Sequence, residues 1–223
     1  MGIVYSKLIP NFADEQNINA MANYCGNFAS ITGDIESVKR IFSIIELAGE
    51  NEGIFGLLIN VQCCADEDRW SFNVSNFGCR SDIDKVEFLE NATFVDNEDG
   101  TAELYTTFTT PWSPPLEFYA SLSQIYNVSV QVEGEECGND YFFVGLAEGG
   151  SWVEESETSY SEGVYRHQPD YFWDGYLESD IEWMVEEEWT EEQIREKYPY
   201  VTEKDLTEII NLFNSYKTEL NEN

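Results

Sequence analysis

Positively charged side chains are scarce in this sequence: its 223 residues include 11 Lys and Arg against 44 Asp and Glu, with a single histidine. A protein that contacts nucleic acid directly needs Lys and Arg to neutralise the phosphates. The composition therefore argues against direct nucleic-acid binding.

Thiol and imidazole groups are too few and too dispersed for a structural zinc site. The cysteines are odd in number, they include no C-x-x-C pair, and His167 is the single imidazole. This usage is typical of a reducing compartment rather than of a disulfide-linked secreted domain. The five cysteines are Cys25, Cys63, Cys64, Cys79 and Cys137.

Long apolar runs are lacking as well. No basic n-region followed by an apolar h-region opens the chain, and no run of about 18 apolar residues occurs anywhere in it. We therefore expect a cytoplasmic protein with no membrane span.

Recognisable catalytic motifs are missing too. There is no phosphate-binding Gly-x-x-x-x-Gly-Lys pattern, and nothing near His167 marks a nucleophile. Carboxylate pairs cannot be singled out for acid–base chemistry or metal binding, because 44 acidic residues produce such pairs by chance. We expect a protein that is not an enzyme and holds no cofactor and no dedicated metal ion.

The sequence is rich in aromatic residues and in negative charge. With 13 Tyr, 14 Phe, 6 Trp and 42% apolar residues, the chain can build a core and is not disordered throughout. Its net charge of −33 equals that of roughly 56 Å of B-DNA, which carries one charge per ~1.7 Å. Three explanations remain open: solubility or salt adaptation, mimicry of DNA toward a basic partner, and metal binding.

The first half of the chain begins with a leader over residues 1–20. A strand is predicted over residues 23–33, and Asp34 is expected to cap a helix because Ile35, Val38 and Ile41 recur at helical intervals. The stretch from Gly53 to Val61 is less regular.

Residues 69–77 alternate between large apolar and polar side chains, which predicts a half-buried strand. The acidic run ending in Asp99 and Gly100 has the wrong spacing for a calcium loop and predicts a hairpin turn. A strand is expected to follow over residues 101–108.

A strand-to-helix corner is predicted where this strand ends. Ser113 is expected to cap the next helix, Pro114 to occupy its first position, and Trp112 to fill the seam beneath the corner. Residues 116–126 carry apolar side chains at helical spacing.

Alternating segments over residues 128–132 and 141–146 predict two more strands. Two β-α-β units folded onto one antiparallel sheet, with both helices on one face, define an α+β, ferredoxin-like arrangement. We expect this domain to span residues 21–150.

Four short motifs stand out in the sequence: Met-Ala-Asn-Tyr-Cys-Gly-Asn over residues 21–27, Ile-Thr-Gly-Asp over 31–34, Asn-Val-Ser-Asn-Phe-Gly over 73–78 and Trp-Ser-Pro-Pro over 112–115. In this order they resemble motifs of the Api92-like proteins of phages and mobile elements, which have a ferredoxin-like domain. Phe77 stands where the family often has Trp, and Cys79-Arg80 replaces its usual Lys-Trp. The resemblance implies a ferredoxin-like fold over about residues 21–150 and a phage or plasmid setting, but no activity or catalytic residues.

Beyond Gly150 the composition changes, and residues 151–223 form an expected third region, an acidic extension that ends in a helical pair. Residues 154–192 hold 14 Asp and Glu and one Arg, interleaved with aromatic residues, which favours an ordered acidic face over a disordered tail. The expected partner-binding residues are Glu154, Glu155, Glu157, Asp170, Asp174, Glu178, Asp180, Glu182, Glu186, Glu187, Glu188, Glu191 and Glu192.

The end of the chain is predicted to be helical. Residues 190–193 read Thr-Glu-Glu-Gln, which is a capping box; Pro199 ends that helix and Thr202 begins another. Residues 189–213 look locally like the helix-turn-helix of some antitoxin-like proteins, but the negative charge argues against DNA reading. We expect the apolar stripe of the last helix to serve packing or homodimer formation; its residues are Leu206, Ile209, Ile210, Phe213 and Tyr216.

These patterns favour a phage or mobile-element accessory protein that acts as an acidic DNA mimic. Its expected partner is a basic nucleic-acid-binding protein of a bacterial host, such as a defence nuclease or effector complex. Two alternatives from other classes are a structural or virion-associated protein and a carboxylate-based, metal-dependent enzyme.

Overall fold

The computed structural model describes residues 24–49, 52–64, 68–83 and 85–222. The expected leader over residues 1–20 and the first three residues of the 21–27 motif lie outside these ranges. The described chain divides after Thr158 into a sheet-bearing unit and a C-terminal helical unit, and each is described by itself.

The sheet-bearing unit contains a six-stranded sheet in which all neighbouring strands are antiparallel. Its spatial order is β2-β3-β1-β4-β5-β6. The strands are β1 (Tyr24–Asp34), β2 (Thr93–Asp96), β3 (Thr101–Pro111), β4 (Ser129–Glu136), β5 (Tyr141–Glu148) and β6 (Ser151–Thr158).

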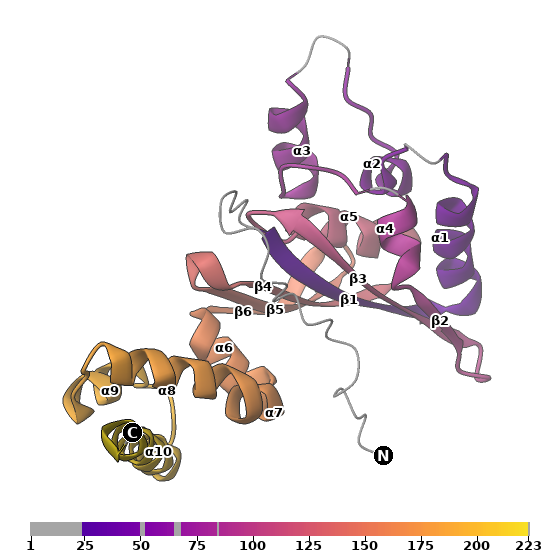
Figure 1. Ribbon diagram of the computed structural model, residues 1–223. Coiled ribbons are helices and arrows are strands. Elements are labelled where there is room, and N and C mark those ends of the chain that lie inside the picture. Colours follow the sequence, from indigo (N-terminus) through magenta and orange to yellow (C-terminus); the bar gives the residue numbers. More distant parts are fainter. Residues whose placement is uncertain (1–23, 50–51, 65–67, 84, 223) are drawn as a thin grey trace. The chain divides into compact units, whose positions relative to one another are not determined.

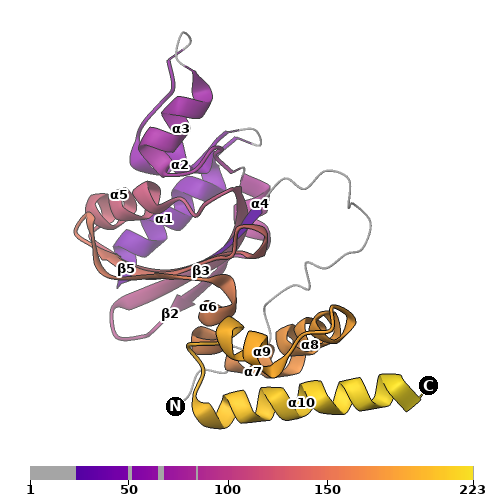
Figure 2. The same ribbon diagram turned by 90° about the vertical axis from the view of Figure 1, so that its left-hand side faces the viewer.

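The five helices described in this unit lie on one side of the sheet (Figures 1 and 2). Strands β1 to β4, with a helix after β1 and another after β3, reproduce the ferredoxin-like order and connections, so the predicted α+β fold is confirmed. Strands β5 and β6 extend the sheet beyond β4. The helices are α1 (Ile35–Leu47), α2 (Ile54–Ile59), α3 (Arg69–Phe77), α4 (Lys85–Glu90) and α5 (Leu116–Tyr126).

Helix α1 begins where the sequence predicts. The Asp34 carboxylate accepts hydrogen bonds from the Ser37 backbone N–H at 3.0 Å and from the Ser37 hydroxyl at 2.6 Å. These bonds hold the pKa of Asp34 below its usual range. The side chains of Val38, Ile41 and Ile45 then face the sheet and are fully buried.

The strand predicted over residues 69–77 is wrong, because this segment is helix α3. The Asp68 side chain caps the helix by accepting from the Ser71 N–H at 3.1 Å, and Gly78 ends it with a left-handed φ of 84°. Trp70 and Val74, two of the alternating apolar side chains, are exposed, whereas Asn73 and Phe77 lie four residues apart on the buried face of the helix. The two caps decide between the two structures.

The less regular stretch from Gly53 to Val61 contains helix α2. Asp82 fastens its first turn: one carboxylate oxygen accepts from the Phe55 N–H at 2.7 Å and the other from the Gly56 N–H at 3.0 Å. Burial raises the pKa of Asp82, while these bonds oppose the shift. Helices α2 to α4 are thus an insertion between α1 and β2 that the sequence pattern did not reveal.

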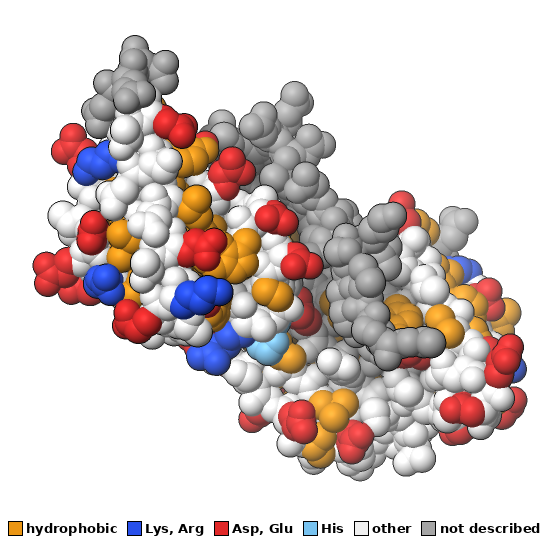
Figure 3. Space-filling view, turned by 90° about the horizontal axis from the view of Figure 1, so that it is seen from below, with side chains coloured by type: hydrophobic (Ala, Val, Ile, Leu, Met, Phe, Trp, Pro, Cys, Tyr) orange, Lys and Arg blue, Asp and Glu red, His pale blue; other side chains and the backbone are white. Residues whose placement is uncertain are grey.

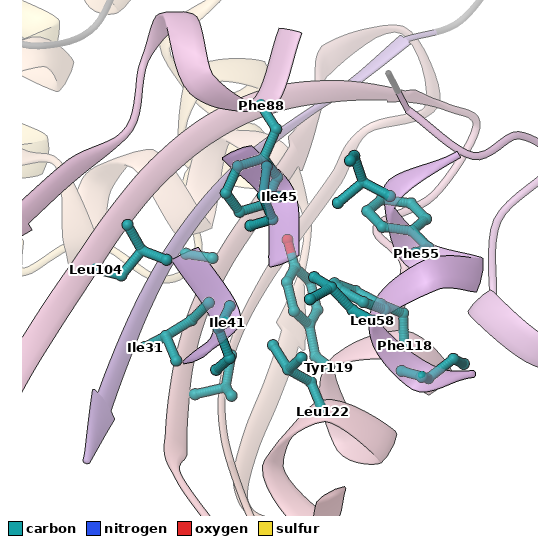
Figure 4. Close-up of a cluster of buried hydrophobic side chains, with 14 of the residues drawn as sticks. Ile31, Ile41, Ile45, Phe55, Leu58, Phe88, Leu104, Phe118, Tyr119 and Leu122 are labelled. Carbon is teal, nitrogen blue, oxygen red and sulfur yellow. The ribbon is translucent and has the colours of Figure 1, made fainter. Parts of the chain in front are cut away.

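The core of this unit lies between the sheet and these helices (Figure 4). Phe55 of α2 stacks on Phe118 of α5 with ring centroids 4.3 Å apart, and Phe88 of α4 stacks on Phe108 of β3 at 5.9 Å. The hydroxyl of Tyr126 donates to the Leu58 carbonyl at 2.9 Å. Rings of the inserted helices therefore complete the core over the sheet.

The strand-to-helix corner exists, but its residues have other roles than predicted. The cap position of α5 is Pro115, with no side-chain cap, and Ser113 instead donates its hydroxyl to the Gly78 carbonyl at 3.0 Å. Trp112 is 45% exposed, with a left-handed φ of 74°, and lies over the Arg80 guanidinium. Trp112, which was expected to fill the seam beneath the corner, is instead a surface side chain that stacks on the Arg80 guanidinium.

The division after Thr158 falls later than the predicted boundary at residue 150. Residues 151–158 form β6, which pairs with β5 and so belongs to the sheet. Their acidic side chains gave no alternating apolar pattern, and for that reason the strand was missed in the sequence.

The helical unit has a core of its own, which includes the fully buried Phe172, Met184, Ile194 and Tyr198. The predicted capping box is confirmed, since the side chains of Thr190 and Gln193 each bond the other's backbone N–H. Its helices are α6 (Tyr160–His167), α7 (Pro169–Tyr171), α8 (Leu177–Glu186), α9 (Glu191–Lys197) and α10 (Glu203–Glu222), with a π-helical turn over Phe172–Tyr176.

The long helix α10 runs beside α8 and α9 (Figure 2). Four members of its predicted stripe, Leu206, Ile209, Ile210 and Phe213, are buried within the single chain. The stripe therefore serves packing, and homodimer formation stays a prediction.

Candidate partner-binding surface

The residues predicted to bind a partner are distributed over both units. Glu154, Glu155 and Glu157 lie on β6, whereas the other ten, from Asp170 to Glu192, lie in the helical unit. Figure 3 shows carboxylates interleaved with apolar side chains over the face that it presents. The expected acidic extension is thus two separate sets of carboxylates.

The carboxylates of β6 are exposed and point to both faces of the sheet. Glu154 pairs with Leu146, and Glu155 pairs with Gly145. Since side chains alternate along a strand, Glu155 and Glu157 share one face and Glu154 lies on the other.

The carboxylates of the helical unit follow its chain from α7 to α9. Asp170 lies in α7, Asp174 in the π-helical turn, and Glu178 and Glu182 along α8. Asp180 also lies in α8, and the other five are concentrated where α8 ends and α9 begins: Glu186, Glu187, Glu188, Glu191 and Glu192.

Asp180 differs from the other predicted residues because it is satisfied inside the unit. One of its oxygens lies 3.2 Å from the Lys197 ammonium, and the other accepts a hydrogen bond from the Tyr198 hydroxyl. Burial and the Asp180 charge both raise the pKa of Tyr198. Asp180 is therefore a residue that holds α8 to the end of α9, and its carboxylate is not available to a partner.

The end of α8 is electrostatically unfavourable for the helix. Its last turn contains no basic residue, while Glu186, Glu187 and Glu188 place three carboxylates beside the negative end of the helix dipole. Glu182 and Glu186 are also a like-charge pair at i,i+4 spacing. These charges reduce the stability of α8, so a structural role does not explain them.

By contrast, Glu191 and Glu192 lie in the first turn of α9, where the helix dipole favours negative charge. Glu191 also accepts a hydrogen bond from the Asn214 amide at 3.2 Å. The five carboxylates from Glu186 to Glu192 therefore form one continuous acidic turn, which we call the α8–α9 acidic turn.

Other reactive groups give no comparable site. Cys25 and Cys79 are buried, and burial raises the pKa of the Cys79 thiol to about 12. Within the described ranges, no group of three or more His, Cys, Asp and Glu side chains is arranged to hold a metal ion. Among those same residues, no helix is both long and apolar enough to cross a membrane.

The order of strands and helices defines the class of protein: an α+β protein built on a ferredoxin-like domain. Residues 90–169 match the family model described as the ferredoxin-like domain in Api92-like protein. The resemblance to Api92-like proteins is therefore confirmed over these residues, which include the Trp-Ser-Pro-Pro corner and extend past the expected end at residue 150.

Among solved structures, the chain is similar to protein api92 from Yersinia pseudotuberculosis, with 14% sequence identity and a TM-score of 0.33. The likeness covers 43% of this chain and 32% of the length of that one. The comparison with curated proteins returned no match.

Proposed function

We propose that this chain is a phage or mobile-element accessory protein that inhibits a bacterial protein by occupying its basic nucleic-acid-binding surface. In this proposal it is not an enzyme, and it acts in the host cytoplasm against a defence nuclease or effector complex. The resemblance to Api92-like proteins supports the proposed phage setting, and the net charge of −33 supports the proposed mode of action.

The observation that carries the proposal is the α8–α9 acidic turn. Three of its carboxylates lie at a helix end where they destabilise the helix. Side chains that lower the folding stability are expected at functional sites, because binding can require charges at positions where they disfavour the local structure. Solubility alone would be served equally well by carboxylates at helix N-termini.

The physical basis of binding would be the same as for DNA itself. The summed negative field speeds the encounter with a basic groove, and contact releases the counterions that the groove's Lys and Arg side chains hold. Affinity should therefore fall steeply as salt concentration rises.

The experiment compares the wild-type chain with a variant that keeps side-chain shape but removes charge from this turn. Displacement of a fluorescent DNA duplex from a basic host protein, identified by low-salt capture from bacterial lysate, gives the affinity at several salt concentrations. The variant combines Glu186→Gln, Glu187→Gln, Glu188→Gln, Glu191→Gln and Glu192→Gln.

We expect about tenfold weaker displacement by this variant at low salt and a shallower dependence on salt, because fewer charge pairs form. A control variant removes five exposed glutamates of the sheet-bearing unit and so has the same net charge. An equal loss in both variants, or none in the first, would contradict the proposal. The control combines Glu36→Gln, Glu46→Gln, Glu90→Gln, Glu98→Gln and Glu117→Gln.

A further inference from the structure

A groove lies on the helical unit between the π-helical turn, α8 and α10. Its lining combines an apolar floor with an acidic rim and includes no Lys or Arg. Leu177 and Ile181 of the floor are buried, while Leu212 is 41% exposed. The lining residues are Trp173, Asp174, Leu177, Glu178, Ile181, Leu212 and Tyr216.

The acidic rim is a row of carboxylates along one side of the groove. Asp174, Glu178 and Glu182 follow one another at intervals of four residues, which places them on the same face of consecutive helical turns. From the opposite helix, the Tyr216 hydroxyl donates to Glu182 at 3.1 Å. The same hydroxyl lies 3.5 Å from Glu178, so the row is tied to α10 through both glutamates, and Asp174 and Glu178 line the groove.

Aromatic rings stand beside these carboxylates. Trp173 and Tyr216 both line the groove, and Trp173 is carried by the π-helical turn. A π-helical turn inside a helical segment is energetically poor and occurs frequently at functional sites. Here it presents Trp173 and Asp174 as neighbours on the groove.

The same unit already binds a cation with this combination of groups. The Lys197 ammonium lies 3.2 Å from Asp180 and within 5.3 Å and 5.8 Å of the ring centroids of Trp183 and Trp189. A carboxylate with aromatic faces is a favourable setting for a positive side chain, since ion pairing and cation–π attraction act together. The groove offers a carboxylate pair and two rings, but its lining supplies no cation of its own.

We propose that this groove receives an arginine side chain of the basic partner protein, flanked by apolar residues that lie on its floor. The guanidinium would stack on Trp173 and pair with Asp174 and Glu178, while its methylene stem covers Leu177 and Leu212. Arginine fits better than lysine because its planar, weakly hydrated head can stack and pair at once. This inference rests on the proposed function and adds the side chain that one part of the surface recognises.

The test uses three acetylated and amidated tripeptides, Leu-Arg-Leu, Leu-Lys-Leu and Leu-citrulline-Leu, added to the full chain. Binding is followed by NMR through the indole N–H resonances of the 6 Trp residues, after assignment by Trp→Phe variants. We expect the arginine peptide to shift the Trp173 resonance most, the lysine peptide less, and the uncharged citrulline peptide least.

The combined variant Asp174→Asn and Glu178→Gln should weaken binding of the arginine peptide about threefold to tenfold, because each exposed charge pair is modest. Glu36→Gln with Glu46→Gln removes the same charge elsewhere and should leave binding unchanged. Both altered groove residues are exposed, so loss of folding does not confound the result. Equal shifts with citrulline, no effect of the groove variant, or a response centred on another Trp would overturn the inference.

The two proposals can fail separately. The five-glutamine variant of the α8–α9 acidic turn changes no lining residue, so it should still bind the arginine peptide with wild-type affinity. Loss of DNA displacement without loss of peptide binding supports both proposals. Peptide binding by a chain that never displaces DNA would overturn the proposed function alone, and displacement unaffected by the groove variant would overturn the groove inference alone.

Discussion

Among the residues that the structure describes, Trp112 is the one aromatic residue with a left-handed backbone conformation. Large side chains adopt a left-handed φ only at a free-energy cost of about 1–2 kcal/mol, yet its φ is 74°. Its ring centroid lies 4.4 Å from the Arg80 guanidinium carbon, and the same carbon lies 4.5 Å from the ring centroid of Trp70. The corner between β3 and α5 is thereby joined to helix α3 through one arginine.

Replacement of this residue separates backbone strain from stacking. Trp112→Ala keeps the strain and loses the stack, whereas Trp112→Gly loses both, so we expect the glycine variant to have the higher unfolding free energy by about 0.5–1 kcal/mol. At an ordinary exposed position the order would be reversed. Urea denaturation of both variants measures the difference, and a more stable alanine variant would show that the backbone is not strained.

At the scale of elements, the end of α8 is a Schellman motif built on an unfavourable residue. The Trp189 N–H donates to the Met184 carbonyl at 3.0 Å, and the Glu188 N–H donates to the Val185 carbonyl at 3.1 Å. Glu188 therefore takes a left-handed φ of 54°, a conformation that glycine adopts without strain. The residue combines backbone strain with charge repulsion.

Glu188→Gly should raise the unfolding free energy by about 0.5–1 kcal/mol, since it relieves both effects, while Glu188→Gln relieves only the charge and should gain about half of that. Chemical denaturation at low salt provides the comparison. If both variants are less stable than the wild type, Glu188 contributes to folding and the functional explanation of its charge loses its support.

Several helix ends were predictable from the sequence, but a cap alone did not decide the type of element, since α3 is capped by Asp68 and was predicted as a strand, whereas α5 has no side-chain cap and was predicted as a helix. Asp34, Thr190 and Pro199 marked helix ends correctly because each acts on its own backbone or neighbours. The prediction over residues 69–77 was wrong because the alternating side chains Trp70 and Val74 are exposed, so their alternation did not report burial. Strand β6 was missed because its exposed glutamates leave no alternating apolar pattern, although the turn at Gly149 and Gly150 that joins it directly to β5 is a hairpin signal present in the sequence.

The candidate site, too, was predictable only where local sequence determines it. The acidic composition located the α8–α9 acidic turn, but it could not separate Asp180 from its neighbours, because the ion pair with Lys197 depends on tertiary packing. The groove was missed for a related reason: Trp173 and Tyr216 are far apart in sequence, and only the packing of α10 on α8 brings them together.

At the scale of the whole molecule, negative charge dominates both units. Residues 159–222 alone contain 17 Asp and Glu against 5 Lys and Arg. Within the described ranges three salt bridges are formed, and all of them lie in the helical unit. Most carboxylates therefore repel one another across the surface, which opposes the compact state.

Salt should stabilise the folded chain by screening this repulsion. We expect the thermal midpoint to rise by several degrees, roughly 5 °C, between about 10 mM and 0.5 M NaCl, where the Debye length falls from ~30 Å to a few ångströms. The five-glutamine variant should show a smaller rise. A midpoint that does not change with salt would mean that the charges are too well solvated to interact.

The two outermost strands of the sheet also bear on how the protein meets other chains. Strand β2 has only four residues, and β6 carries exposed glutamates on both faces, so neither free edge is an inviting template for another strand. Backbone pairing with a further copy, which leads to edge-to-edge aggregation, is thereby discouraged. We therefore expect a partner to be recognised by side chains. A partner that binds by adding an extended strand to a sheet edge should not bind this sheet.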